Sequence, residues 1–181
     1  MSRFDYEATA AQRETFDRDG AVLLESVIDN ELLARLETAT ERARDYPGGF
    51  WYKIYLWRRD PDFRDCAMNS PLPGIAAQFL RRDKLTLLYD QLFVKPPRGE
   101  PTPWHNDLPY WPVEGTSVMS IWLALSEVTR RNGGLEFVRG SHRWSRRFHP
   151  FTANPEGTQY APHDDTSSEY ETLPDFDAER D

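Results

Sequence analysis

The sequence contains very little cysteine. Its single cysteine, Cys66, permits no disulfide within the 181-residue chain. Because disulfides are typical of oxidising compartments, their absence indicates a reducing one, and we expect a cytoplasmic protein. We expect Cys66 itself to be a small buried side chain.

A long apolar run is also absent. No stretch approaches the ~20 consecutive apolar residues that a membrane helix requires, and the first residues, MSRFDYE, are mostly polar or charged. We therefore expect no secretory segment and no membrane partner.

The sequence also lacks a cluster of basic residues. Nine of the 30 acidic residues but only one of the 22 basic residues lie in 152–181, which leaves 21 of each sign in 1–151. A neutral body without a basic face does not favour nucleic-acid binding. Four arginine pairs are interpreted as solvated turns and helix ends, and the alternative is that one or two of them bind an anionic substrate such as a CoA ester. They are Arg58-Arg59, Arg81-Arg82, Arg130-Arg131 and Arg146-Arg147.

The length fits one domain, which we assign to residues 1–181. Its first part, 1–82, has helical patterns, 83–151 has strand patterns, and 152–181 reads as an acidic loop or tail. The aromatic content of 13% suits a protein that lines a pocket with rings, although most such rings are ordinary core residues.

The helical part begins with a capping box. Thr9 and Gln12 have its spacing, and they predict a helix over 10–19 that ends at Gly20. Asp29 predicts the start of a second helix, in which apolar residues recur at helical spacing. These are Leu32, Leu33, Leu36, Ala39 and Ala43. Further elements are expected as short strands over 21–25 and 51–57 and a helix over 73–82.

Extended patterns replace the helical ones from Leu85 onward. Apolar runs over 85–97, 117–125 and 132–142 are separated by Gly, Pro and Asn. This alternation of short runs and turn residues is typical of an all-β region.

The most informative segment is Pro103-Trp104-His105-Asn106-Asp107-Leu108-Pro109-Tyr110-Trp111. Side chains two residues apart lie on the same face of a strand, so His105 and Asp107 are predicted to converge, with their nearest N and O atoms within about 4 Å. An imidazole and a carboxylate are two thirds of the 2-His-1-carboxylate set that binds non-haem Fe(II). Taken alone, the same spacing also fits two solvated polar residues on an exposed strand.

Four motifs occur in a fixed order: FVKPP, TPWHNDLPYWP, SIWLAL and NGGLEFVRGSH. Over roughly residues 14 to 150 the chain resembles the phytanoyl-CoA dioxygenase family of Fe(II)/2-oxoglutarate oxygenases. The resemblance implies a mainly β fold, a double-stranded β-helix (jelly roll), with N-terminal helices packed on one sheet. A jelly roll needs about eight strands. We find four or five, so the barrel is expected to be incomplete.

The resemblance also implies a chemistry. His105 and Asp107, with a distal histidine, would bind Fe(II), and Gln91 and Trp122 would contact the cosubstrate 2-oxoglutarate. With O2, the family hydroxylates small organic or acyl-type substrates. An alternative interpretation fits equally well: Gln91 is an ordinary inward-facing strand residue, and Trp122 is an ordinary core tryptophan. Three aromatic side chains are expected to wall the pocket near the metal, namely Trp104, Tyr110 and Trp111.

The second iron-binding histidine and the arginine that anchors 2-oxoglutarate are not found after residue 151. His142, His149 and His163 are interpreted as structural or loop residues. We therefore expect a truncated, catalytically silent chain. Two alternatives stay open: a non-catalytic jelly-roll binding module, and a cupin-like metal enzyme that does not use 2-oxoglutarate. The substrate and the oligomeric state also stay open.

Overall fold

A computed structural model describes residues 6–44, 51–99, 101–153, 160–162 and 169–178. The chain forms two compact units, and the assignment of a single domain stays a prediction. The first unit comprises Met1–Pro47, Tyr52–Phe93 and Ser117–Arg143, and the second comprises Gly48–Trp51, Val94–Thr116 and Trp144–Asp181. In the part of the chain that the structure describes, no helix has the length and hydrophobicity of a membrane span.

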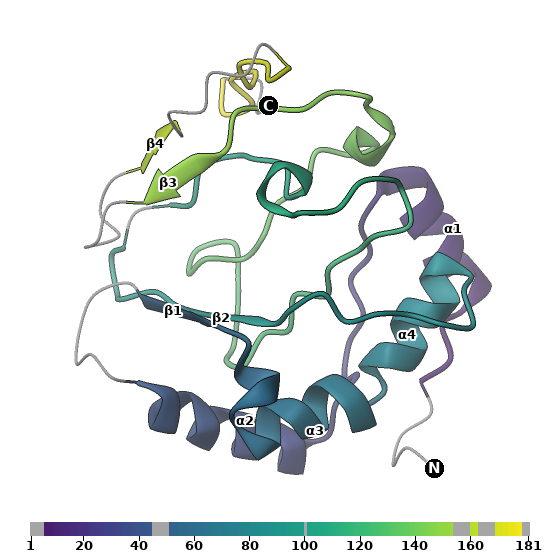
Figure 1. Cartoon of the computed structure of the whole chain (residues 1–181), viewed down its shortest axis with the longest axis vertical. Coiled ribbons are helices and arrows are strands. Elements are labelled where there is room, and N and C mark those ends of the chain that lie inside the picture. Colours follow the sequence, from purple (N-terminus) through teal and green to yellow (C-terminus); the bar gives the residue numbers. More distant parts are fainter. Residues whose placement is uncertain (1–5, 45–50, 100, 154–159, 163–168, 179–181) are drawn as a thin grey trace. The chain divides into compact units, whose positions relative to one another are not determined.

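The first helix of the first unit, α1 (Ala10–Asp19), starts and stops where the sequence predicts (Figure 1). The Thr9 hydroxyl accepts the Gln12 backbone N–H, and the Gln12 side chain accepts the Thr9 N–H, which together form the predicted capping box. Gly20 ends the helix with a φ of 86°, a left-handed conformation that glycine adopts at little cost.

The end of α1 is covered by a turn that lies about 120 residues further along the chain. The Gly140 N–H donates to the Asp19 carbonyl (2.8 Å), and His142 Nε2 donates to the Asp17 carbonyl (3.1 Å). The Arg143 guanidinium donates to the Arg18 carbonyl (2.7 Å). These donors satisfy carbonyls that a helix end leaves unpaired. His142 therefore helps to cap the end of α1, in agreement with the structural role that the sequence indicated.

Helix α2 (Asn30–Ala43) begins at the predicted cap, because Asp29 accepts the Leu32 N–H at 2.7 Å. Its apolar stripe is buried as expected at Leu32, Leu36 and Ala39. Leu32 and Leu36 pack with Cys66 of α3 (Pro61–Asn69) in one core cluster. A second cluster joins Ala8 to two residues of α4 (Leu72–Leu80), Ile75 and Phe79.

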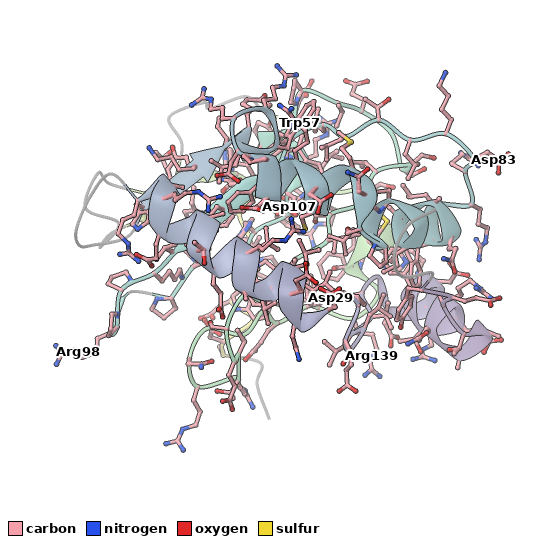
Figure 2. The ribbon with its side chains drawn as sticks, turned by 90° about the horizontal axis from the view of Figure 1, so that it is seen from below. Asp29, Trp57, Asp83, Arg98, Asp107 and Arg139 are labelled. Carbon is pink, nitrogen blue, oxygen red and sulfur yellow. The ribbon has the colours of Figure 1, made fainter. Side chains whose placement is uncertain are left out.

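Helix α3 was not predicted. Its start signal is present in the sequence, since Asp60 caps it and Pro61 occupies its first turn, but its apolar residues are too sparse to show a period. Helix α4 confirms the helix predicted over 73–82, with both ends shifted by one or two residues. Asp83, in the bend that follows, is exposed and points away from the ribbon (Figure 2).

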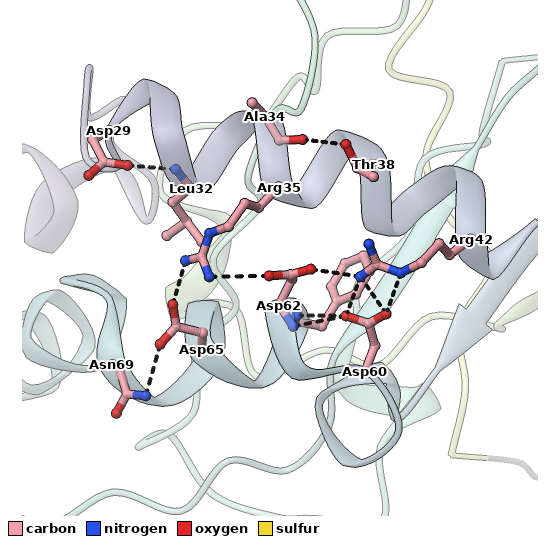
Figure 3. Close-up of polar contacts among 11 residues, drawn as sticks. Asp29, Leu32, Ala34, Arg35, Thr38, Arg42, Asp60, Asp62, Asp65 and Asn69 are labelled. Atoms are coloured by element: carbon pink, nitrogen blue, oxygen red, sulfur yellow. Dashed lines mark hydrogen bonds and ion pairs between the residues drawn. The ribbon is translucent and has the colours of Figure 1, made fainter.

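Charged side chains join α2 to α3 in the arrangement of Figure 3. Arg42 contacts Asp60 (2.8 Å) and Asp62 (2.6 Å), and Arg35 contacts Asp62 (3.2 Å) and Asp65 (2.5 Å). The two arginines lie on one face of α2, two turns apart, and the three carboxylates come from the start of α3. This ladder fixes the two helices side by side while their apolar faces form the core.

Strands are few among the described residues. β1 (Trp51–Ile54) pairs with β2 (Gln91–Val94), and β3 (Phe151–Ala153) pairs antiparallel with β4 (Tyr160–Pro162), with Thr152 opposite Ala161. The β3–β4 hairpin falls in the segment expected to be loop.

The strands expected over 21–25, 117–125 and 132–142 are not formed in the described residues. Extended backbone becomes a strand only when a neighbour completes the hydrogen-bond ladder, and these segments have no such neighbour there. Several of their apolar side chains are consequently exposed, including Trp122 (46%), Leu135 (50%) and Phe137 (64%). The jelly roll itself stays a prediction.

Candidate metal centre

His105 and Asp107 lie in the second unit and converge, as the spacing predicted. His105 Nε2 is 3.3 Å from Asp107 Oδ1. The segment is not a strand, which corrects the expected local structure. Residues 101–106 form no regular secondary structure, and Asp107 has helical dihedral angles (φ −72°, ψ −34°) at the start of the short 3-10 helix Leu108–Tyr110. The turn at Asp107, and not a strand face, brings the carboxylate to the imidazole.

The orientation of the His105 ring is fixed by a backbone contact. Nδ1 lies 2.8 Å from the Pro103 carbonyl oxygen. A carbonyl can only accept, so Nδ1 carries the proton and donates it. Nε2 is therefore the nitrogen whose lone pair is available, and it is also the atom that faces Asp107. A histidine that donates one ring N–H to a backbone carbonyl and presents the other nitrogen is the usual form of a metal ligand.

The electrostatics of the pair follow from this geometry. The hydrogen bond to Asp107 raises the pKa of His105, burial lowers it, and the Pro103 carbonyl adds to the increase, so the net shift is upward. The His105 side chain is 35% exposed and that of Asp107 is 47% exposed. The site is thus open to solvent ions, and a metal cation between Nε2 and Oδ1 would take the place of the proton that Nε2 carries when the imidazole is protonated.

His105 and Asp107 provide part of the ligand set that a divalent metal ion requires. An imidazole nitrogen and a carboxylate oxygen are suitable ligands for Fe(II). In the described ranges, however, no group of three His, Cys, Asp or Glu side chains is placed to hold a metal ion. His149 instead packs its ring against Tyr170 at 5.7 Å. His163 lies outside the described residues.

The residues predicted to contact 2-oxoglutarate lie in the first unit. Gln91 is the half-buried first residue of β2, and Trp122 is largely exposed in an irregular segment. Their proximity to His105 stays a prediction.

The aromatic side chains around the pair have different neighbours. The rings of Tyr110 and His105 make a T-shaped contact with their centroids 5.6 Å apart, and the role of Tyr110 as a pocket wall stays a prediction. Trp104 packs against Phe176 at 5.6 Å and donates its indole N–H to Asp177 at 3.1 Å. Trp111 is half-buried.

Sequence reasoning missed two polar side chains of this segment. Asn106 and the Tyr110 hydroxyl both bind backbone groups of residues 148–151. No local pattern announces these contacts, because the partners are 41 and 42 residues away.

Comparison with known proteins identifies a family match and several similar proteins. The family model for phytanoyl-CoA dioxygenase (PhyH) matches residues 16–175. An ectoine dioxygenase of Sphingopyxis alaskensis is 27% identical over 160 residues, covering 77% of this chain and 51% of that protein. An ectoine dioxygenase of Bordetella bronchiseptica is 25% identical over 166 residues, covering 78% and 52%.

A shorter match joins 34% of this chain to 21% of a probable alpha-ketoglutarate-dependent hypophosphite dioxygenase of Stutzerimonas stutzeri, at 28% identity over 61 residues. No solved structure matches significantly. The chain spans about half the length of the ectoine dioxygenases that it matches. Because the family model covers most of its residues, the chain belongs to the phytanoyl-CoA dioxygenase family.

Proposed function

We propose that this chain supplies the iron-binding pair of an Fe(II)- and 2-oxoglutarate-dependent dioxygenase. The observation that carries the proposal is the pairing of His105 Nε2 with Asp107 Oδ1 at 3.3 Å, while Nδ1 is committed to the Pro103 carbonyl. The imidazole nitrogen and the carboxylate oxygen therefore face one another. Family membership and the dioxygenase names of the relatives support the same chemistry.

The residues have distinct roles in this proposal. His105 and Asp107 hold the metal, and the exposed side of the pair leaves room for small ligands. Gln91 and Trp122 contact 2-oxoglutarate. The bound iron supplies the oxidation, in which a C–H substrate, 2-oxoglutarate and O2 give the hydroxylated product, succinate and CO2. The Tyr110 ring, in T-shaped contact with His105, shields one side of the imidazole from water.

The substrate is a small organic or acyl-type molecule. The first class agrees with relatives named for ectoine, and the second with the name of the family.

A second function, a non-catalytic binding module, is favoured by one observation. The described residues offer two metal ligands and no third. Two protein ligands hold a divalent ion far less tightly than three. We therefore expect the 181-residue chain by itself to bind metal weakly and to be catalytically silent.

Metal binding tests the pair first. Mn(II) is titrated into the chain, and the free ion is followed by electron paramagnetic resonance. We expect weak binding that His105→Ala and Asp107→Ala each abolish, whereas the control variants His142→Ala and Asp83→Ala retain it. Equal binding by the wild-type chain and His105→Ala would remove the pair from any metal site.

Turnover then separates enzyme from binding module. The chain is loaded with Fe(II) under argon, given 2-oxoglutarate and O2, and succinate is quantified beside a metal-free control. Succinate that exceeds the control and disappears in His105→Ala would show that this chain completes the site itself. The cupin-like alternative predicts metal binding with no visible charge-transfer band when 2-oxoglutarate is added to the anaerobic Fe(II) protein.

A further inference from the structure

The metal-binding pair is not held by burial. The side chains of His105 and Asp107 are 35% and 47% exposed, so packing leaves them much rotational freedom, and the backbone around them is neither strand nor long helix. A ligand pair needs its donor atoms within a few tenths of an ångström of the binding geometry. Something other than packing must therefore restrain this segment.

Asn106 provides a first restraint from the opposite side of the chain. Its Oδ1 accepts the Phe148 backbone N–H at 3.3 Å. Phe148 is only 4% exposed, so this N–H is removed from water and depends on a protein acceptor. Asn106 lies between the two candidate ligands, and fastening it limits rotation of the backbone on both sides.

Tyr110 provides a second restraint one helical turn after Asp107. Its hydroxyl accepts the Phe151 N–H at 2.6 Å and donates to the Phe151 carbonyl at 3.1 Å. A hydroxyl can do both at once, so a single side chain satisfies the donor and the acceptor of one residue. The same ring touches His105 edge-on, which links this anchor to the imidazole.

The segment that receives both anchors is itself fixed on its other side. Glu171 forms a parallel β-bridge with Phe148. Its backbone carbonyl accepts the His149 N–H at 3.1 Å, and its backbone N–H donates to the Arg147 carbonyl at 2.8 Å. The Glu171 carboxylate also binds Arg146 at 2.8 Å. The segment that anchors the His105–Asp107 pair is therefore itself held by backbone hydrogen bonds to Glu171.

We propose that Asn106 and Tyr110 are positioning residues that hold His105 and Asp107 in their converged geometry by fastening residues 103–110 to residues 148–151. The inference rests on the proposed function, because positioning has a purpose only if the pair binds a metal. It assigns the converged geometry of the pair to hydrogen bonds from two side chains that do not touch the metal.

Two variants remove one anchor each. Tyr110→Phe deletes the hydroxyl and keeps the ring against His105, and Asn106→Ala deletes the acceptor for Phe148. Matched controls lose a comparable hydrogen bond in the first unit: Tyr6→Phe, whose hydroxyl accepts from Gln12, and Asn69→Ala, whose amide donates to Asp65. Circular dichroism and thermal unfolding establish that all four variants fold.

Mn(II) affinity is the first measurement. We expect Tyr110→Phe and Asn106→Ala to bind Mn(II) about tenfold more weakly than the wild-type chain, the usual effect of removing a partner that orients metal ligands. The controls should bind like the wild type. A purely stabilising role would lower the unfolding temperature of the two variants and leave the affinity of the folded protein unchanged, which would overturn the proposal.

The imidazole tautomer is the second measurement, and it needs no metal. Nitrogen-15 NMR of the histidines at about pH 9, where imidazole is ordinarily neutral, should show His105 protonated at Nδ1 in the wild type. In both anchor variants the population should move toward the Nε2–H form, because the bond to Pro103 is no longer enforced. An unchanged tautomer in both variants would contradict positioning.

The two measurements separate the two hypotheses. If the wild-type chain binds no Mn(II) but the tautomer shifts in the variants, the proposed function fails and the anchors stand. If the wild type binds Mn(II) and the variants match it in affinity and tautomer, the proposed function stands and the anchors fail.

Discussion

The Arg42 guanidinium on α2 lies 2.8 Å from the carboxylate of Asp60, the residue that caps α3. Asp60 thus serves two helices, since its Oδ1 also accepts the Asp62 N–H at 2.9 Å. Burial raises the pKa of Asp60, but the hydrogen bonds from Arg42 and from the backbone outweigh burial and lower it. The pair therefore couples the packing of α2 on α3 to pH.

The first prediction concerns acid stability. Because the pKa of Asp60 is lower in the folded protein, its contribution is present above the unfolded value of about 3.9 and is lost as the pH falls below that value through the folded pKa. Asp60→Asn, which keeps a capping side chain, should unfold with a weaker pH dependence in this range. Asp83→Asn, an exposed control, should retain the wild-type slope in urea titrations.

Two substitutions separate the contributions of the Asp60 cap and of its ion pair to the free energy of unfolding. Asp60→Ala removes the cap as well as the ion pair, and a lost cap costs about 1 kcal/mol. Asp60→Asn should cost less, because a partly exposed ion pair contributes about 0.2–1 kcal/mol. Equal unfolding free energies for the two variants would show that the cap contributes nothing.

The second prediction concerns the core between α2 and α3. Leu36 is 1% exposed and packs in the cluster that contains Cys66. Leu36→Ala should lower the free energy of unfolding by about 3 kcal/mol, because it removes buried methyl groups and leaves a cavity. Leu23→Ala is the matched control, since Leu23 is 81% exposed, and it should change stability by less than about 0.5 kcal/mol. Denaturant titration measures both.

The third prediction concerns the single thiol. Burial raises the pKa of Cys66 to about 11, although the contact with Ser70 opposes the shift. The thiolate is the reactive form, so Cys66 should react slowly with a thiol reagent at pH 8 in the native protein and rapidly in urea. Because the chain has one cysteine, the labelled fraction reports this site alone. Rapid labelling of the native protein would show that the α2–α3 core opens.

The same thiol should destabilise the protein at high pH. With a folded pKa above the unfolded value of about 8.5, the contribution of Cys66 is fully present below about pH 8.5 and is lost as the pH rises toward 11. Cys66→Ala should flatten that alkaline slope. A slope that persists in the variant would assign it to other groups.

The fourth prediction concerns the exposed apolar side chains of the segments that form no strand. Phe137 is 64% exposed and Leu135 is 50% exposed, and apolar groups left in water favour association with another chain. The chain should therefore associate with increasing concentration and bind a hydrophobic dye. Phe137→Glu should reduce both, while Arg98→Glu should not. Sedimentation at several concentrations tests the association.

Local signals predicted the elements that depend on local contacts. Thr9 with Gln12, Asp29 and Gly20 mark helix ends through hydrogen bonds that span three or four residues, and the stripe of α2 shows which face is buried. The convergence of His105 and Asp107 was predicted from the two-residue spacing of a strand, but it is the turn at Asp107 that produces it.

What the sequence did not predict depends on distant partners. The alternation over 117–125 is compatible with a strand, but a strand forms only beside another one. The anchor from Asn106 to Phe148 spans 42 residues and leaves no periodic trace. Asp60 and Pro61 did signal the start of α3, but a start signal without an apolar stripe did not distinguish a helix from a turn.

The covering of α1 by Gly140, His142 and Arg143 has a consequence for the order in which the chain acquires its structure during synthesis. The donor Arg143 is translated 125 residues after its acceptor Arg18. At roughly 5–20 residues per second, the last turn of α1 waits on the order of ten seconds for these donors. Until then its carbonyls are open to water or to a chaperone, so a ribosome stalled before residue 140 would carry a frayed first helix.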